Sequence, residues 1–428
     1  MSRRDVAHLL RRVAANPTAE ELDGFSGQLP DAVFLLLTEE SPRYHEFEAE
    51  LRPLEEAAVR SNAANAYRTW FMWRLVLSPC PLREWMTVFW LEYFGLGIER
   101  VADLALFDDV VRSMRRLALG DYHELPAAVL LHPAFLLNVR APLNYRSDPS
   151  EQVGAAILRT CLGYREQDFS AQAGELARAF SGRFINRGRL RVSEFERDTG
   201  EKTILGRSKA FEAEDIPRLI AEDARAASWT ARRLYRWFCC DTRMPSEEFL
   251  SPPAEQLRQN GSVAAAVRLI LSSQWFFSEA VRRQKLRRPV EFAAALLRAL
   301  KGRITLRTVT ELTAMGQDIL QPTTLDGWSE AGNYFSPLAL IQRMNLAAKL
   351  VGTDENFGGG LARGAVETWG DDLPNALTDL MTDQAIPVEI GSRWEDLRAR
   401  YAASSGDRER VAAAMIYLLA VSPVFQTA

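Results

Sequence analysis

Histidines are the first side chains to consider for catalysis or metal binding, and the sequence holds four of them: His8, His45, His123 and His132. None belongs to an HxxxH or HxH pair, and no cysteine or carboxylate flanks one at the spacing of metal ligands. The pattern therefore predicts no metal site and no cofactor. It favours structural or surface roles for the histidines, with proton transfer as the alternative.

The four cysteines also lack a reactive pattern. Cys80, Cys161, Cys239 and Cys240 show no CxxC spacing, and the last two end the apolar run RLYRWFCC. Buried thiols in such a run behave as small hydrophobic groups. This usage is typical of a reducing compartment.

Acidic residues occur as sequence neighbours, in the pairs Glu20-Glu21, Glu39-Glu40, Glu55-Glu56, Asp108-Asp109, Glu247-Glu248 and Asp371-Asp372. Adjacent residues on a helix point about 100° apart, so the two members of a pair do not share a site. A catalytic pair of carboxylates would have to assemble across helices. The pattern favours solvated helix faces, and no GxSxG elbow, kinase motif set or dinucleotide fingerprint is present.

Aromatic residues are clustered between Trp70 and Phe94. Trp85 with Phe89, and Trp90 with Phe94, are four residues apart and would stack along one helix face. A hydrophobic core is the favoured interpretation, and a pocket for an apolar or ring-shaped ligand is the alternative.

Helical periodicity dominates the elements that must position these residues. Thr18 and Glu21 have the spacing of a capping box. Pro289 and Pro337 are predicted to begin helices, the second with Ser336 as its cap. Helical spacing also predicts that Val263, Val267, Ile270 and Leu271 face the core. The expected fold is mainly α and multi-helical.

Strand signals concentrate in one region. Two short segments within Arg189–Gly206 flank the turn-favouring triplet Asp198-Thr199-Gly200, which predicts a short β-hairpin or an extended loop. Three consecutive glycines in VGTDENFGGGLARG, from Val351, favour a linker over a nucleotide cradle, because the lysine of a phosphate-binding loop is missing.

These signals divide the chain into five parts. We expect an N-terminal helical lobe, a basic hairpin or loop insertion, a second helical lobe packed with the first, a glycine-rich linker and a C-terminal helical cap. Their bounds are 1–182, 183–209, 210–350, 351–370 and 371–428.

Composition excludes some classes of function. The chain of 428 residues has 47% hydrophobic residues, 25% charged residues and a net charge of −4. These values suit a packed globular protein and argue against a nucleic-acid partner. The N-terminus has paired arginines but no apolar stretch after them, and the apolar runs are too short for a membrane span. A soluble, cytoplasmic protein is expected, although export with a partner stays open.

Several collinear segments together resemble a known bacterial family, the domain of unknown function 1800. The matching stretches are VAHLLRRVAANPTAEELD, PLREWMTVFW, RRLALGDYHEL, ARAFSGRF, DTGEKTILGR, TARRLYRWF, LRRPVEFAAALLRAL, GQDILQPTTLDGW and LIQRMNLA. They cover about residues 5–350 in conserved order. The resemblance implies a helical fold.

Departures from the family pattern bear on function. Where the resemblance implies a histidine-asparagine-histidine triplet, this chain has Leu91, Glu92 and Tyr93. Leu117 and Arg197 stand at two further positions where a histidine is implied. A polar stretch of the family is replaced by Pro149, Ser150 and Glu151, with Gly154 and Ala155 in place of later charges. A leucine has neither the lone pair nor the proton of an imidazole, so that chemistry is lost where it stands.

The combination predicts a degenerate, non-catalytic relative, a pseudoenzyme that acts as a scaffold or regulatory subunit of a protein complex. The partner implied by the resemblance is an intact relative or one of the alkaline-phosphatase-like proteins linked with the family.

Two alternatives stay open. An enzyme with a relocated site would use Glu92, Asp198 and Lys202, which are ionisable groups at positions where the family is polar. A module that binds an apolar or aromatic ligand would use the aromatic cluster around Trp70–Phe94. Its candidates are Trp70, Trp90, Arg178, Glu291 and Trp328. Arg178, Lys202 and Glu291 are also candidates for a buried ionic network.

Overall fold

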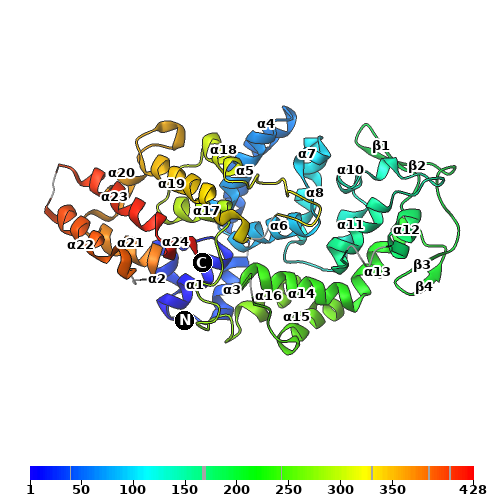
Figure 1. Cartoon of the computed structure of the whole chain (residues 1–428), viewed down its shortest axis with the longest axis horizontal. Coiled ribbons are helices and arrows are strands. Elements are labelled where there is room, and N and C mark those ends of the chain that lie inside the picture. The colour runs from blue at the N-terminus through cyan, green and yellow to red at the C-terminus, as the bar shows by residue number, and fades with distance from the viewer. Residues whose placement is uncertain (39, 166–169, 242, 329–330, 384–385, 404–405) are drawn as a thin grey trace.

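Helices make up most of the molecule in the computed structural model, which describes residues 1–428 except 39, 166–169, 242, 329–330, 384–385 and 404–405 (Figure 1). Two small antiparallel strand pairs are the only sheets among the described residues. The mainly α fold and the short hairpin element predicted from the sequence are confirmed.

The N-terminal third of the chain is a series of helices. They are α1 (Arg3–Val13), α2 (Ala19–Phe25), α3 (Pro30–Thr38), α4 (Pro42–Arg60), α5 (Ala64–Leu77), α6 (Pro81–Tyr93), α7 (Ile98–Val101), α8 (Leu104–Leu117), α9 (Glu124–Leu130) and α10 (Pro133–Asn138). Thr18 and Glu21 form the predicted capping box at the start of α2. Helix α6 lies at the centre of this group and packs against α1, α3, α5 and α8. Its side chains are therefore buried almost throughout.

The strands follow two further helices and a short 3-10 turn. These elements are η1 (Ala141–Leu143), α11 (Glu151–Leu162), α12 (Ser170–Ala179), β1 (Arg183–Asn186), β2 (Arg189–Val192), β3 (Lys202–Ile204) and β4 (Arg207–Lys209). They lie at the right-hand end of Figure 1.

The strands pair as two hairpins, β1 with β2 and β3 with β4. The segments on either side of Asp198-Thr199-Gly200 are therefore not paired with each other. The hairpin turns lie instead at Arg187-Gly188 and Leu205-Gly206, where all four residues have positive φ. Two consecutive left-handed residues are the geometry of tight hairpin turns, and it is compatible with the twist of the strands.

In its described residues, the segment predicted as the second helical lobe contains seven α-helices and two 3-10 helices. They are η3 (Ala213–Asp215), α13 (Ile216–Glu222), α14 (Ala224–Phe238), α15 (Glu247–Asn260), α16 (Val263–Leu271), α17 (Pro289–Ala299), α18 (Leu306–Ala314), η4 (Ala331–Phe335) and α19 (Pro337–Val351). The predicted starts at Pro289 and Pro337 and the Ser336 cap are confirmed. Val263, Val267, Ile270 and Leu271 are buried, as the helical spacing predicts.

The C-terminal elements lie at the left-hand end of Figure 1. They are η5 (Glu355–Phe357), α20 (Leu361–Trp369), η6 (Gly370–Asp372), α21 (Leu373–Thr382), α22 (Val388–Ala403), α23 (Arg408–Val421) and α24 (Pro423–Gln426). Half of the segment expected as a linker, 351–370, is thus the helix α20. Leu361, Ala362 and Ala365 are buried in it and give it an apolar face, which explains why it folds as a helix and packs against α23.

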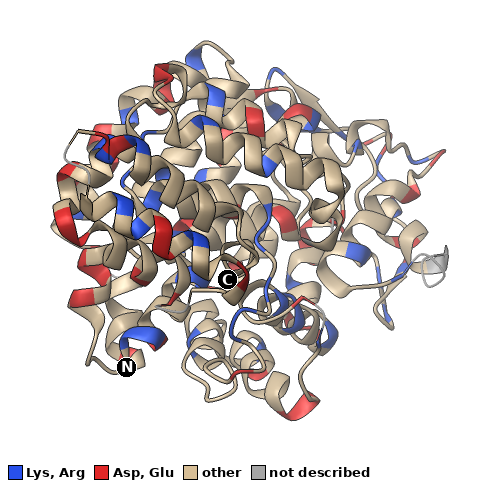
Figure 2. Cartoon of the chain, turned by 60° about the vertical axis from the view of Figure 1, so that its left-hand side comes forward, with Lys and Arg blue, Asp and Glu red and all other residues tan. Residues whose placement is uncertain are grey.

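The N-terminal helices contact the C-terminal ones, although the N-terminus lies at the lower edge of Figure 1 and the C-terminus nearer its centre. Asn16, just after α1, donates a hydrogen bond to the Leu380 carbonyl of α21 at 3.0 Å. Among the described residues, no helix has both the length and the apolar character that crossing a bilayer requires. Figure 2 shows basic and acidic residues interspersed over the helices.

Candidate functional site

Glu92 occupies the middle of the triplet position at which the family resemblance implies a histidine-asparagine-histidine sequence. It lies in the last turn of α6 and is 7% exposed. The Arg288 guanidinium donates to its carboxylate at 2.5 Å, and Arg233 lies 3.7 Å from it. Gly327 covers the same side chain, since a Cβ at that glycine would lie 2.6 Å from Glu92 Cγ. The carboxylate is therefore enclosed and neutralised by cations of this chain.

The neighbours of Glu92 in the triplet are also used for packing. Leu91 is fully buried, and the Tyr93 hydroxyl hydrogen-bonds to Thr230 at 2.9 Å. Burial raises the pKa of Tyr93, so the phenol stays protonated. Leu117, at another implied histidine position, is buried at the end of α8. Arg197, at the third, lies near Glu194 and Glu212 on the surface.

Asp198, Lys202 and Arg178 form a separate cluster beside the hairpins. Arg178 donates to the Asp198 carboxylate at 2.8 Å, and this hydrogen bond lowers the pKa of Asp198. The Lys202 ammonium donates to the carbonyls of Asp198 and Gly200 at 2.6 and 3.0 Å. Burial lowers the pKa of Lys202. These contacts close the loop between β2 and β3, so the side chains have a structural task.

Glu291 lies elsewhere, at the start of α17, where it accepts a hydrogen bond from the Arg288 backbone N–H at 2.8 Å. Arg288 therefore links Glu291 to Glu92, whereas Arg178 and Lys202 share Asp198. The proposed network of Arg178, Lys202 and Glu291 is divided between these two clusters.

Two of the three tryptophan candidates donate hydrogen bonds to backbone carbonyls, and the third is held by ring packing. The Trp90 indole donates to the Ala118 carbonyl at 3.0 Å and the Trp328 indole donates to the Asp318 carbonyl at 3.1 Å. Trp70 is 2% exposed and stacks against Tyr67, with ring centroids 4.8 Å apart. Each ring is therefore part of the hydrophobic core. None of these contacts joins the three rings into one aromatic box.

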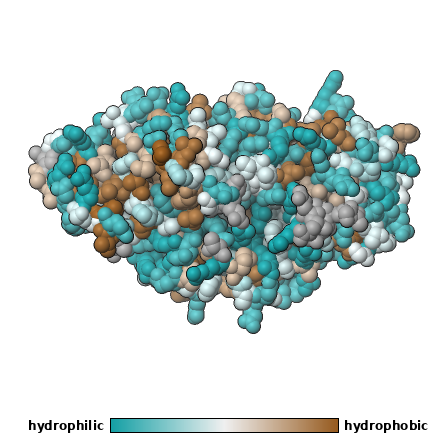
Figure 3. Space-filling model, viewed as in Figure 1, coloured by the Kyte–Doolittle hydropathy of each residue, from teal (hydrophilic) through white to brown (hydrophobic). Residues whose placement is uncertain are grey.

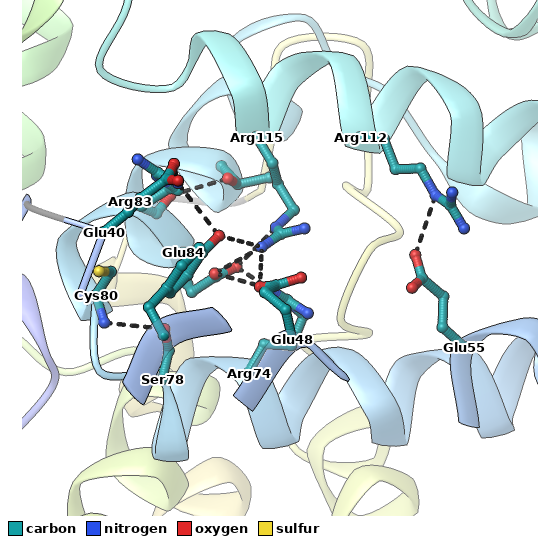
Figure 4. A network of polar contacts seen from close by, with 12 residues as sticks. Glu40, Glu48, Glu55, Arg74, Ser78, Cys80, Arg83, Glu84, Arg112 and Arg115 are labelled. Carbon is teal, nitrogen blue, oxygen red and sulfur yellow. Dashed lines mark hydrogen bonds and ion pairs between the residues drawn. The ribbon is translucent and has the colours of Figure 1, made fainter. Parts of the chain in front are cut away.

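A larger ionic network that sequence reasoning missed joins α4, α5, α6 and α8 (Figure 4). Glu84, which is fully buried, binds Arg74 at 3.1 Å and Arg115 at 3.0 Å. Glu48 pairs with the same two arginines. Burial alone would raise the pKa of Glu84, but the charges of Arg115 and Arg74 outweigh it and lower the pKa to about 2. The network is fully ionised at neutral pH.

A carboxylate pair lies beside that network and does assemble across helices. Glu55 of α4 and Asp108 of α8 both contact the Arg112 guanidinium, at 3.2 and 2.8 Å. Burial, together with the charge of Asp108, raises the pKa of Glu55 to about 7. Asp108 also accepts a hydrogen bond from the buried Tyr67 hydroxyl at 2.8 Å. A carboxyl group with a pKa in this range has the proton affinity that a general base needs near neutral pH.

The histidines hold structural contacts. His8 is buried and bonds the Phe276 carbonyl at 2.9 Å, and His123 bonds the Arg258 carbonyl at 3.0 Å. His132 caps α10 and lies 3.1 Å from Asp109. Within the part of the chain that the structure describes, no three histidine, cysteine, aspartate or glutamate side chains gather as metal ligands would.

Gly154 stands where the resemblance implies a charged residue. It is in α11, and a Cβ there would lie 1.9 Å from the Ala173 carbonyl oxygen of α12. The two helices approach each other so closely that no side chain fits between them. A charged residue at position 154 is incompatible with this packing.

Comparison with known families decides the membership of the chain. The family model described as a protein of unknown function, DUF1800, matches residues 8–152 and 153–427. The chain belongs to the DUF1800 family. No curated protein and no solved structure matches it.

Membership of the DUF1800 family extends beyond the segments recognised in the sequence, which end near residue 350. The matched segments meet within α11 and reach through α20 to α24, so the C-terminal helices belong to the family fold. In this DUF1800 member, Arg233 and Arg288 are the partners of Glu92 that sequence reasoning missed. Both lie in stretches that carry the family resemblance, but their approach to Glu92 arises only in the folded chain.

Proposed function

We propose that this DUF1800 member is a non-catalytic scaffold or regulatory subunit of a protein complex. The observation that carries the proposal is the enclosure of Glu92 by Arg288 and Arg233. A metal ion brought to this carboxylate would meet two arginine charges, 2.5 and 3.7 Å from it, so metal binding is disfavoured there.

The close packing at Gly154 supports the same proposal. Helices α11 and α12 have closed over the position at which the resemblance implies a charge. A working site would need room there for the charged side chain. At Leu91, Tyr93 and Gly154, residues that allow close packing stand where the resemblance implies histidines or a charge, as expected of a chain selected for its fold and its surface.

An exposed apolar stripe on α19 supports a protein partner. Leu338 is 65% exposed, Ile341 53% and Met344 42%, and the three follow one another at helical spacing. Figure 3, seen from the same side as Figure 1, shows hydrophobic residues gathered on the left half of the view, where the C-terminal elements lie. Contiguous apolar surface of this kind is typical of protein–protein contacts.

The proposal is tested by purifying the tagged chain from native cells at low concentration and identifying what elutes with it by mass spectrometry. We expect a DUF1800 relative that retains the histidine triplet, or an alkaline-phosphatase-like protein, in fixed proportion. The double variant Leu338→Asp, Ile341→Asp should lose that partner, because two carboxylates would be desolvated at the contact.

Leu35→Asp is the matched control, since Leu35 is 57% exposed on α3, away from α19 in the sequence. It should retain the partner. A chain that elutes alone and as a monomer contradicts the proposal.

A further inference from the structure

A cavity of about 980 Å³ lies beside the glycine-rich segment and takes no part in the contacts described above. It is bounded by α5, the end of α17, the loop from Lys301 to Thr305, and the segment that leads into α20. Pockets of about 300–1,000 Å³ are the usual size for organic ligands and cofactors. The cavity is therefore large enough to hold such a molecule.

One side of the cavity is apolar and well fixed. Trp73 forms part of it, and its indole donates to the Ile304 carbonyl at 3.1 Å. Leu300 is 3% exposed, and the Phe357 ring lies 5.3 Å from the Lys349 ammonium. Leu77 completes this wall and is 49% exposed, so apolar surface is left open to whatever enters. An aliphatic or aromatic body would be stabilised here by burial.

Another part of the cavity wall is formed by glycine backbone. Gly358, Gly359 and Gly360 all have positive φ, which explains why three glycines stand together. A Cβ at Gly358 would lie 2.9 Å from Arg303 Cβ, so the segment is packed against Arg303. Gly360 then begins α20 without a capping side chain. The N–H groups in the first turn of a helix have no acceptor within the helix and favour an anion.

Charged side chains of both signs line the cavity. Lys301, Arg303 and Arg363 line it, against the two carboxylates Glu355 and Glu367. Lys301 pairs with Glu20 and Arg363 with Glu409. Arg303 is exposed and forms no ion pair within the described residues. Its guanidinium is therefore available to an anionic group of a ligand.

We propose that this cavity binds an amphiphilic anion, a molecule with an apolar body against Trp73, Leu300 and Leu77 and one carboxylate or phosphate at Arg303 and the first turn of α20. The site is separate from the position of Glu92, and the inference goes beyond the proposed scaffold function without depending on it. A ligand here would bridge α5, α17 and α20, which lie far apart in the sequence.

The test is isothermal titration calorimetry of the full chain with decanoate, decyl phosphate and the neutral decan-1-ol. We expect saturable one-to-one binding of at least one anion, and the tighter of the two identifies the head group. Arg303→Ala should weaken it about 5-fold or more through the loss of a charge-assisted hydrogen bond. Leu77→Asp should weaken it about 10-fold or more by placing a like charge in the apolar wall. Both positions are exposed, so the variants are expected to fold.

Two matched controls keep the result specific. Arg307→Ala removes an exposed arginine of α18 that does not line the cavity, and Leu35→Asp places a carboxylate on α3. Both should bind as the natural chain does. The inference is overturned if neither anion binds saturably, if decan-1-ol binds as tightly as the anions, or if Arg303→Ala and Leu77→Asp leave binding unchanged.

Discussion

At the scale of single residues, the ionisable groups of this protein are mostly held by other groups of the chain. Glu92 is enclosed by two arginines, and Asp198 by an arginine and the lysine that closes its loop. A group in such a pair is difficult to recruit for proton transfer, since its charge already stabilises the fold. Removing one partner of a buried pair is much more costly than removing both.

This asymmetry gives a prediction for Arg288. Arg288→Met should lower the free energy of unfolding by about 2–4 kcal/mol, because Glu92 stays buried with only Arg233 at 3.7 Å. The double variant Glu92→Leu, Arg288→Met should recover most of that loss. Urea unfolding measures both, with the exposed Arg307→Met as control. A double variant less stable than Arg288→Met would contradict the structural role of the pair.

Glu55 should make stability depend on pH. Its pKa is about 7 in the folded chain, against an ordinary value of 4.5 when unfolded. Between these values the folded state binds more protons than the unfolded state, so the contribution of Glu55 to stability falls as pH rises from about 4.5 to 7. Above pH 7 the buried charge destabilises the fold.

Glu55→Gln removes that charge and should stabilise the protein at pH 8 by about 1–2 kcal/mol, allowing for solvent screening. At pH 5 it should have little effect, because Glu55 is then protonated in the folded state. Urea unfolding at the two pH values measures this, and the exposed neighbour variant Glu56→Gln should show no such difference. Equal effects of Glu55→Gln at both pH values would refute a raised pKa.

At the scale of elements, close approaches of backbone decide how helices and loops are placed. Three left-handed glycines turn the chain into α20, and two-residue turns close both hairpins. The tightest approach is between α11 and α12 at Gly154. Because position 154 carries no side chain, α12 can lie directly against α11. This contact places α12 and the hairpins that follow it.

Two glycine-to-alanine changes should therefore act in opposite directions. Gly154→Ala should destabilise the protein by about 1–3 kcal/mol, because its Cβ would overlap the Ala173 carbonyl oxygen. Gly174→Ala, in α12, meets nothing within 4 Å and should stabilise by about 0.5–1 kcal/mol through helix propensity. Thermal unfolding compares the two. A stabilising Gly154→Ala would show that the helices are further apart than described.

At the scale of the whole molecule, contacts of the N-terminus with distant segments join the chain together. Asn16 is fully buried and accepts a hydrogen bond from Arg287 at 2.9 Å, and its backbone carbonyl accepts one from Arg298 at 3.0 Å. Its amide donates to Leu380 of α21. Through its side chain and its backbone carbonyl, this one residue connects the first helices, α17 and the C-terminal helices.

Asn16→Ala should lower the free energy of unfolding by about 2–4 kcal/mol, because the buried Arg287 guanidinium loses an acceptor and the Leu380 carbonyl keeps, among the described side chains, only Arg11, at 3.5 Å. Amide hydrogen exchange should show weakened protection in α21 as well as in α1. Asn260→Ala, at the exposed end of α15, is the control and should change neither. Loss of protection confined to α1 would contradict the connecting role of Asn16.

Much of the fold follows from short-range features of the sequence. The capping box at Thr18, the proline-initiated helices at Pro289 and Pro337, and the buried face of α16 all depend on residues within one or two turns of each other. Their hydrogen bonds and side-chain spacing are local, so these features can be predicted from the sequence alone. The collinear motifs also identified the family.

The tertiary structure alone decided which charged groups meet. Glu92 and Arg288 are 196 residues apart, and Glu55 reaches Asp108 only because α4 and α8 pack side by side. Pairing across that separation depends on how the helices cross, and this arises from the packing of the whole core rather than from any local pattern. The sequence could therefore tell that the implied histidines were replaced, whereas the enclosure of Glu92 and the cavity beside α20 exist only in the folded chain.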